Sequence, residues 1–251
     1  RRSFARGGRT AAYVSAGCYV LASLIFILIT KELLGPEDKG AAAGSSALQN
    51  LGAFFRFVHD RWPYDLIISV LFSVGILALI PLGISLRELA GRRTLRNDLM
   101  AATLTAGAVL GAASQMLILA GRDLVAHEGV CACKNALLEM ASLNASRIGI
   151  EEYGGKWLGL AFFVLVGIGV YLASLDAGRW LSFDSRWVQL GMVVAGLYLV
   201  GVVASLFGMQ GLFELVVGIG GGILAPAWAF WLGKQLPVGD SVGSGAVSAA
   251  P

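Results

Sequence analysis

Residues 187–232 read WVQLGMVVAGLYLVGVVASLFGMQGLFELVVGIGGGILAPAWAFWL. This stretch holds two apolar runs of about 20 residues, and only the link Gly208-Met209-Gln210-Gly211 separates them. A mostly apolar run of that length crosses the hydrocarbon core of a bilayer as one helix. The short link therefore predicts two antiparallel membrane-spanning helices that form a tight hairpin.

The rest of the chain contains four more runs of the same kind. The chain is 57% hydrophobic and only 14% charged, whereas soluble domains carry about 25% charged residues. We therefore expect an all-α, polytopic transmembrane bundle over residues 1–235, with a flexible Gly/Ser/Ala-rich tail at 236–251. The six expected spans are about 11–30, 66–86, 99–120, 157–175, 187–207 and 212–232.

Basic residues near the ends of the spans predict the orientation. The N-terminal flank carries four arginines and no acid, and the loop 86–98 carries four arginines and two acids. Loops rich in Lys and Arg stay in the cytoplasm. We expect a protein of the cytoplasmic (inner) membrane, with both termini cytoplasmic and the long first and third loops outside. Aromatic side chains fall at the expected boundaries, as is typical of membrane proteins: Trp62, Tyr64, Trp157, Trp180 and Trp187.

The two long outer loops each contain an amphipathic pattern. In the segment 46–62, apolar side chains recur at three- and four-residue steps, which predicts a helix with one apolar face. A second helix is expected over 134–147, with Leu137, Met140, Ala141 and Leu143 toward one side. The first helix either lies in the outer membrane interface or packs on the end of the bundle.

One cluster has the side chains of a metal or redox site. His127, Cys131 and Cys133 lie within seven residues, and His59 in the other long loop is the second of the two histidines. Thiolate and imidazole groups bind zinc and copper, whereas two cysteines on an oxidising face also form disulfides. Metal binding, a Cys131–Cys133 disulfide and free thiols all remain open.

Glu214 and Gln115 are polar side chains at or near membrane depth. Ionisable groups at this depth are costly and are candidates for function. Glu214 closely follows the hairpin link, so it either serves a binding site or reaches the outer interface. Gln115 either joins such a site or makes an interhelical hydrogen bond of about 0.6–2 kcal/mol.

The last span contains the sequence GIGGG at 218–222, followed by Pro226. One interpretation is close packing of helices at small residues spaced four apart. The residues expected to pack in this way are Gly107, Gly111, Gly218 and Gly222. The alternative is a broken helix that exposes carbonyl groups to a ligand. The residues expected at that ligand are Glu214, Gln115, Gly220 and Gly221.

The sequence lacks the residues that several classes of function require. The lysines nearest the spans, Lys31, Lys156 and Lys234, lie at span ends, so we expect no retinal Schiff base. No histidine lies within a span, so we expect no haem held by two intramembrane histidines. Nucleotide-binding, metalloprotease and serine-nucleophile motifs are missing, which argues against an enzyme. The net charge of +3 gives no indication of nucleic-acid binding.

Short stretches spread along the chain carry a family resemblance. They are Ala12-Tyr13-Val14-Ser15-Ala16-Gly17, Phe54-Phe55-Arg56-Phe57, Asp65-Leu66, Tyr153-Gly154-Gly155, Leu158-Gly159-Leu160 and Leu212-Phe213-Glu214-Leu215. In these stretches the chain resembles a broad family of uncharacterised bacterial inner-membrane proteins with about six helices. The resemblance implies a bacterial inner-membrane protein and assigns no activity or cofactor.

These observations favour a non-catalytic membrane protein. We expect an accessory or scaffold subunit of a membrane complex, or a binder of lipid-like molecules, with bound lipid. Its expected partners are membrane lipids and either other membrane subunits or further copies of itself. One alternative is a transporter with a site near the last span, and another is an outer-face redox or metal-binding protein.

Overall fold

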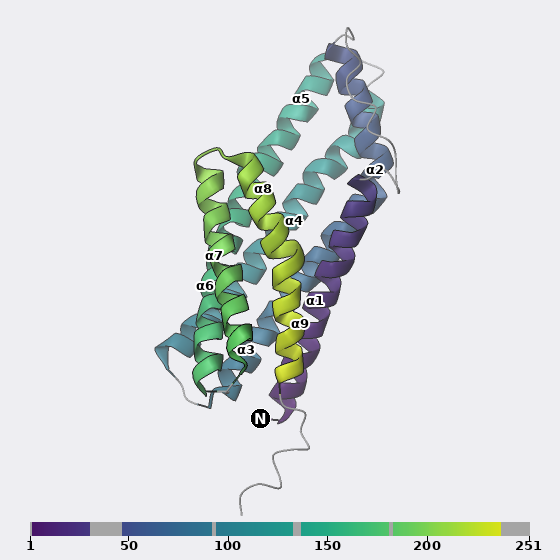
Figure 1. The fold of residues 1–251 in the computed structure, drawn as a ribbon. Helices are drawn as coiled ribbons and strands as arrows, with labels where there is room; N and C mark the ends of the chain where they lie inside the picture. Colours follow the sequence, from purple (N-terminus) through teal and green to yellow (C-terminus); the bar gives the residue numbers. More distant parts are fainter. Residues whose placement is uncertain (1, 31–46, 92–93, 133–136, 181–182, 237–251) are drawn as a thin grey trace, which may run out of the picture. The chain divides into compact units, whose positions relative to one another are not determined.

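The computed structural model describes residues 2–30, 47–91, 94–132, 137–180 and 183–236, and within these ranges it is helical without a strand (Figure 1). Six helical segments are long and apolar enough to cross a membrane, which confirms the predicted all-α bundle of six spans. Large apolar side chains on the spans, such as Val20, Ile27 and Val203, are exposed. The protein is therefore an integral membrane protein, with lipid as the natural solvent for these side chains. The six segments are Ser3–Ile29, Gly52–Leu89, Leu95–Glu128, Leu138–Asp176, Ser185–Leu206 and Gln210–Gln235.

The first three spans belong to helices that run beyond the predicted boundaries. They are α1 (Arg2–Thr30), α2 (Ala47–Leu77) with α3 (Leu79–Leu89), and α4 (Leu95–Ala132). Helices α2 and α3 are separated only at Ala78. Pro81 has no N–H to donate to the carbonyl four residues earlier, that of Leu77, so the helical ladder is interrupted at this point.

The amphipathic segment 46–62 is not a separate helix. From Ala47 it forms the first part of α2, which continues through Pro63 into the second span. Its apolar face is covered by protein, because Phe55 and Val58 pack in one cluster with Val125 of α4 and Met140 of α5. This burial favours the interpretation in which the segment packs on the end of the bundle.

The third loop and the fourth span also form one helical rod. Helix α5 (Leu137–Ile148) leads through the π-helix η1 (Gly149–Gly155) into α6 (Lys156–Trp180). Of the expected apolar side, Met140 is buried and Leu143 packs against it, whereas Ala141 is exposed. The expected helix start at Lys134 lies outside the described residues.

The last two spans form the predicted hairpin. Helix α7 (Ser185–Leu206) turns into α8 (Gln210–Ile219), the π-helix η2 (Gly220–Leu224) and α9 (Ala225–Gln235), which follow one another as one rod (Figure 1). Gly208 makes the turn with a positive φ of 71°. Met209 N donates to Ala204 O and Gly208 N to Ser205 O, the Schellman arrangement that ends helices at glycine. Of the predicted tail, residues 237–251 lie outside the described residues.

The chain divides into two compact units. Unit 1 comprises Arg1–Tyr19, Gly75–Val109 and Phe162–Pro251, and unit 2 comprises Val20–Val74 and Leu110–Ala161. The largest fully buried side chains of unit 1 include Leu82, Met100, Leu104, Trp187, Tyr198, Trp228 and Leu232. Unit 2 has clusters around Phe55, Val58, Val125, Ala126 and Met140 and around Ala22, Ile29 and Ile68.

Candidate functional site

Unit 2 contains a buried carboxylate held by two arginines from different helices. Asp65 of α2 is only 6% exposed at its side chain. Its Oδ1 accepts Arg61 Nε at 3.2 Å from the preceding turn of α2, and it lies 3.0 Å from Arg122 Nη1 of α4. A carboxylate at such a position needs opposite charges close by, because an unpaired buried charge is strongly destabilising.

The same arginine connects Asp65 to a second acid. Arg122 acts electrostatically on Glu151 of η1, and Arg147 Nη1 of α5 donates to Glu151 Oε2 at 2.8 Å. We call Arg61, Asp65, Arg122, Glu151 and Arg147 the ionic network. It alternates positive and negative groups across α2, α4 and α5–η1, and it contains three guanidinium groups against two carboxylates.

The π-helix η1 presses Glu151 against α4. A Cβ at Gly121 would lie 2.8 Å from Glu151 Cγ, so glycine is needed for this close approach. At the end of η1, Ser114 Oγ of α4 donates to Gly155 O at 2.7 Å. Short π-helical turns occur frequently at functional sites, and this one places an acid in contact with Arg147 and under the electrostatic influence of Arg122.

The two histidines lie beside one another near the network. The ring centres of His59 and His127 are 6.4 Å apart, and Trp62 packs edge-on against His127 at 5.2 Å. His59 Nδ1 is 2.6 Å from Ala126 O, and His127 Nδ1 is 3.0 Å from Asp123 Oδ1. The structure thus brings together two of the four predicted metal ligands. Among the described residues there is no group of three or more such ligands suited to a metal, and the side chains of Cys131 and Cys133 lie outside them.

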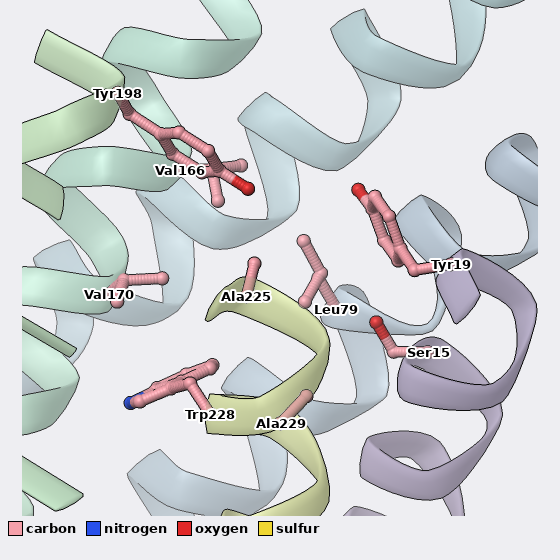
Figure 2. Close-up of a pocket in the computed structure, with 9 residues that line it drawn as sticks. All are labelled: Ser15, Tyr19, Leu79, Val166, Val170, Tyr198, Ala225, Trp228 and Ala229. Atoms are coloured by element: carbon pink, nitrogen blue, oxygen red, sulfur yellow. The ribbon is translucent and has the colours of Figure 1, made fainter. Parts of the chain in front are cut away.

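Unit 1 contains a small cavity lined by three hydroxyl-bearing side chains. Figure 2 shows Ser15 and Tyr19 on α1 on one side, with Tyr198 of α7 opposite them. All three residues are buried. The space open to the centres of water-sized molecules is about 20 Å³. The remaining lining is Leu79, Val166, Val170, Ala225, Trp228 and Ala229.

The π-helix η2 lies beside this cavity. Ala225 N donates to Gly220 O, in π geometry, and Pro226 has no N–H. The Gly221 carbonyl therefore lacks the donors that α or π geometry would supply from residues 225 and 226. A Cβ at Gly221 would be 3.7 Å from Tyr198 Oη. The last span is continuous and not broken. Its π-helical turn and Pro226 still leave the Gly221 carbonyl without an α- or π-helical hydrogen bond.

The polar residues proposed for a transporter site have different surroundings. Glu214 is exposed, and its Oε1 accepts Gln210 Nε2 at 3.1 Å within α8. Gln115 is partly buried on α4 and belongs to unit 2, whereas Glu214, Gly220 and Gly221 belong to unit 1. Gly220 packs near Leu197 of α7. Whether Glu214 and Gln115 serve a common ligand stays a prediction.

The glycines expected to pack helices differ from one another. A Cβ at Gly107 would lie 2.8 Å from Val166 Cγ2, so this glycine permits close contact between α4 and α6. Gly111 is buried and Gly222 partly buried. Gly218 is exposed, and a Cβ there would meet nothing within 4 Å. Gly218 therefore makes no close contact with another helix in the part of the chain that the structure describes.

Sequence analysis missed the residues around which both sites are built. Asp65 directly precedes the predicted span at Leu66, and no local sequence pattern assigns it a role. The available signal was an acid at the start of the span 66–86, with Arg61 four residues before it and Arg122 just after the span 99–120. Tyr19 and Tyr198 were counted only as apolar span residues, and nothing in their spacing indicates that they line one cavity.

Comparison of the chain with protein-family models, with curated proteins and with solved structures finds no match.

Proposed function

We propose that the protein is a non-catalytic subunit of the bacterial cytoplasmic membrane that binds anionic lipid through its ionic network. In this proposal both termini face the cytoplasm, and the network lies at the outer end of the spans. The bound lipid stabilises the assembly of this accessory or scaffold protein with other membrane subunits. The observation that carries the proposal is the convergence of Arg61 and Arg122 on one buried oxygen of Asp65.

The network has more hydrogen-bond donors than acceptors. Each guanidinium group carries about five N–H donors, and each carboxylate offers about four lone-pair sites. Three arginines carry more donors than Asp65 and Glu151 can accept, and one positive charge remains in excess within the network. Two of the Arg147 donors are used by Asn144 Oδ1, and Glu151 Oε1 has no hydrogen-bond partner among the described residues. A phosphodiester supplies both the missing acceptors and the missing negative charge, and arginine matches its geometry.

The position of the network along the chain suits a lipid headgroup. Asp65 and Arg122 flank the predicted spans 66–86 and 99–120, and Glu151 precedes the span 157–175. Three span ends therefore contribute to one polar cluster. Aromatic groups accompany it, since Arg61 lies 5.8 Å from the ring centre of Phe57 and Trp62 is the next residue. Trp62 has an amphipathic ring of the kind typical of the level of the headgroups.

The proposal predicts selective loss of anionic lipid when Arg122 is neutralised. In Arg122→Gln, retention of phosphatidylglycerol should fall about tenfold or more, because a hydrogen bond to a charged group contributes about 1.5–3 kcal/mol. The measurement is native mass spectrometry of the detergent-purified protein titrated with phosphatidylglycerol or phosphatidylcholine. Retention of phosphatidylcholine should not change.

Two further variants separate lipid binding from folding. Arg56→Gln is the matched control, because Arg56 is an exposed arginine outside the network, on α2 like Asp65, and bonds to Gly52 O. Asp65→Asn with Arg122→Gln removes one charge of each sign, so the double variant should fold well and still lose phosphatidylglycerol. Equal retention of phosphatidylglycerol by the wild type and by a folded double variant would refute the proposal.

A further inference from the structure

The cavity of unit 1 is mainly apolar, but hydroxyl-bearing side chains line it from two opposite sides. Figure 2 shows the hydroxyl oxygens of Tyr19 and Tyr198 facing each other across the space, with Ser15 beside Tyr19 on α1. Leu79, Val170 and Trp228 form part of the apolar lining. This arrangement differs from a purely hydrophobic packing defect, in which no hydrogen-bonding group would be present.

The cavity has room for a water molecule and offers partners for one. About 10–15 Å³ of space for water centres suffices to hold one water, which then needs two to four polar partners. The space here is about 20 Å³. A hydroxyl group has one donor and two acceptor sites, so Tyr19 and Tyr198 can each bond to water in addition to another group.

The backbone carbonyl of Gly221 is a second reason to expect water in the cavity. The carbonyl of Gly221 is left without a donor from Ala225 or Pro226, as the register of η2 requires. Ala225, one turn after Gly221, lines the cavity, and a Cβ at Gly221 would lie 3.7 Å from Tyr198 Oη. A buried carbonyl group without a partner is rare and costs free energy at membrane depth. Water in the cavity can supply the missing donor.

We propose that the cavity is a binding site for one ordered water molecule, which bridges the Tyr19 and Tyr198 hydroxyl groups and donates to the Gly221 carbonyl. This water connects α1 to the α7–α9 hairpin within unit 1. By donating to the Gly221 carbonyl, it also lowers the free-energy cost of the π-helical turn in an apolar environment. The inference concerns unit 1 and does not depend on lipid binding by the ionic network.

The direct test is a structure of the full-length protein at a resolution that shows ordered water. A peak within hydrogen-bond distance of Tyr198 Oη is expected in the wild type, and this peak should disappear in Tyr198→Phe. A wild-type map with an empty cavity would overturn the proposal. So would a peak that keeps its position and strength in Tyr198→Phe.

A thermal measurement tests the same site in solution. Tyr19→Phe and Tyr198→Phe should each lower the melting temperature by a few degrees. The double variant should lose less than their sum, because both changes act through one water molecule. Tyr171→Phe, at an exposed tyrosine of α6, is the control and should melt like the wild type. Fully additive losses would contradict a shared water, and Tyr19→Phe alone tests the map if Tyr198→Phe fails to fold.

Discussion

Gly191→Ala should lower the stability of the protein by about 3 kcal/mol, the upper part of the usual range for inserting a methyl group into a packed core. A Cβ at Gly191 of α7 would overlap Ser174 Oγ of α6 and would lie 2.7 Å from Trp228 Nε1 of α9. Such a small added group is therefore forced against two neighbouring helices at once.

Neither neighbour of Gly191 can move away easily. Ser174 is fully buried, and its hydroxyl donates to Val170 O at 2.8 Å. The Trp228 ring stacks on Trp187 with ring centres 5.3 Å apart, and Trp187 Nε1 donates to Trp228 O at 3.1 Å. Since packed interiors transmit strain and do not absorb it, the methyl group should displace a helix.

The measurement is thermal unfolding of the detergent-purified protein, followed by tryptophan fluorescence. Ser174→Ala combined with Gly191→Ala should recover part of the loss, because the overlapping oxygen is gone while the contact with Trp228 remains. Gly196→Ala is the control on the same helix, where a Cβ would meet nothing within 4 Å. This control should be neutral or stabilising by up to about 1 kcal/mol, since alanine favours helices over glycine. Equal effects of Gly191→Ala and Gly196→Ala would contradict the packing described here.

The number of spans and the final hairpin could be predicted because both depend on local sequence. A run of apolar residues has to be long enough for the bilayer, and Gly208 supplies the positive φ that ends α7. The ends of the helices could not be predicted in this way. Hydropathy detects only the lipid-facing part of a helix. Helix α2 extends ahead of the predicted span at 66–86, and tertiary contacts of Phe55 and Val58 bury this added part.

The candidate sites depended on contacts that no local pattern contains. Asp65 and Arg122 are far apart in the sequence and meet only because α2 and α4 pack together. Tyr19 and Tyr198 are likewise far apart in the sequence, on α1 and α7. The one local signal was the glycine run with Pro226, which indicated an irregular last span. The sequence left open whether that irregularity was a break, and the structure has a π-helical turn instead.

Both sites lie beside a π-helical turn. Glu151 of the ionic network belongs to η1, and η2 leads into Ala225, which lines the cavity. A π turn widens the helix by one residue and changes which side chains and carbonyl groups face inward. Glycine is frequent in both turns, at 149, 154 and 155 in the first and at 220–222 in the second. The two turns thus position polar groups inside an otherwise regular apolar bundle.

Asp65→Ala should be the most destabilising removal of a charge in unit 2. The change leaves Arg61 and Arg122 directed at the same place without the carboxylate between them. Removing one partner of a buried ion pair costs about 3–5 kcal/mol. We expect the lower end, about 3 kcal/mol, because the Arg122 side chain is 39% exposed and can reach water or lipid headgroups.

Unfolding of the purified protein by heat or by a denaturing detergent measures this loss. Asp123→Ala is the matched control: its side chain is 51% exposed, and it pairs with His127 on the neighbouring turn of α4. An exposed pair of this kind contributes little, so the control should stay within about 0.5 kcal/mol of the wild type. The double variant Asp65→Asn with Arg122→Gln should recover much of the stability that Asp65→Ala loses, since only one arginine then remains beside a neutral amide. If Asp65→Ala and Asp123→Ala unfold alike, Asp65 does not hold the two arginines together.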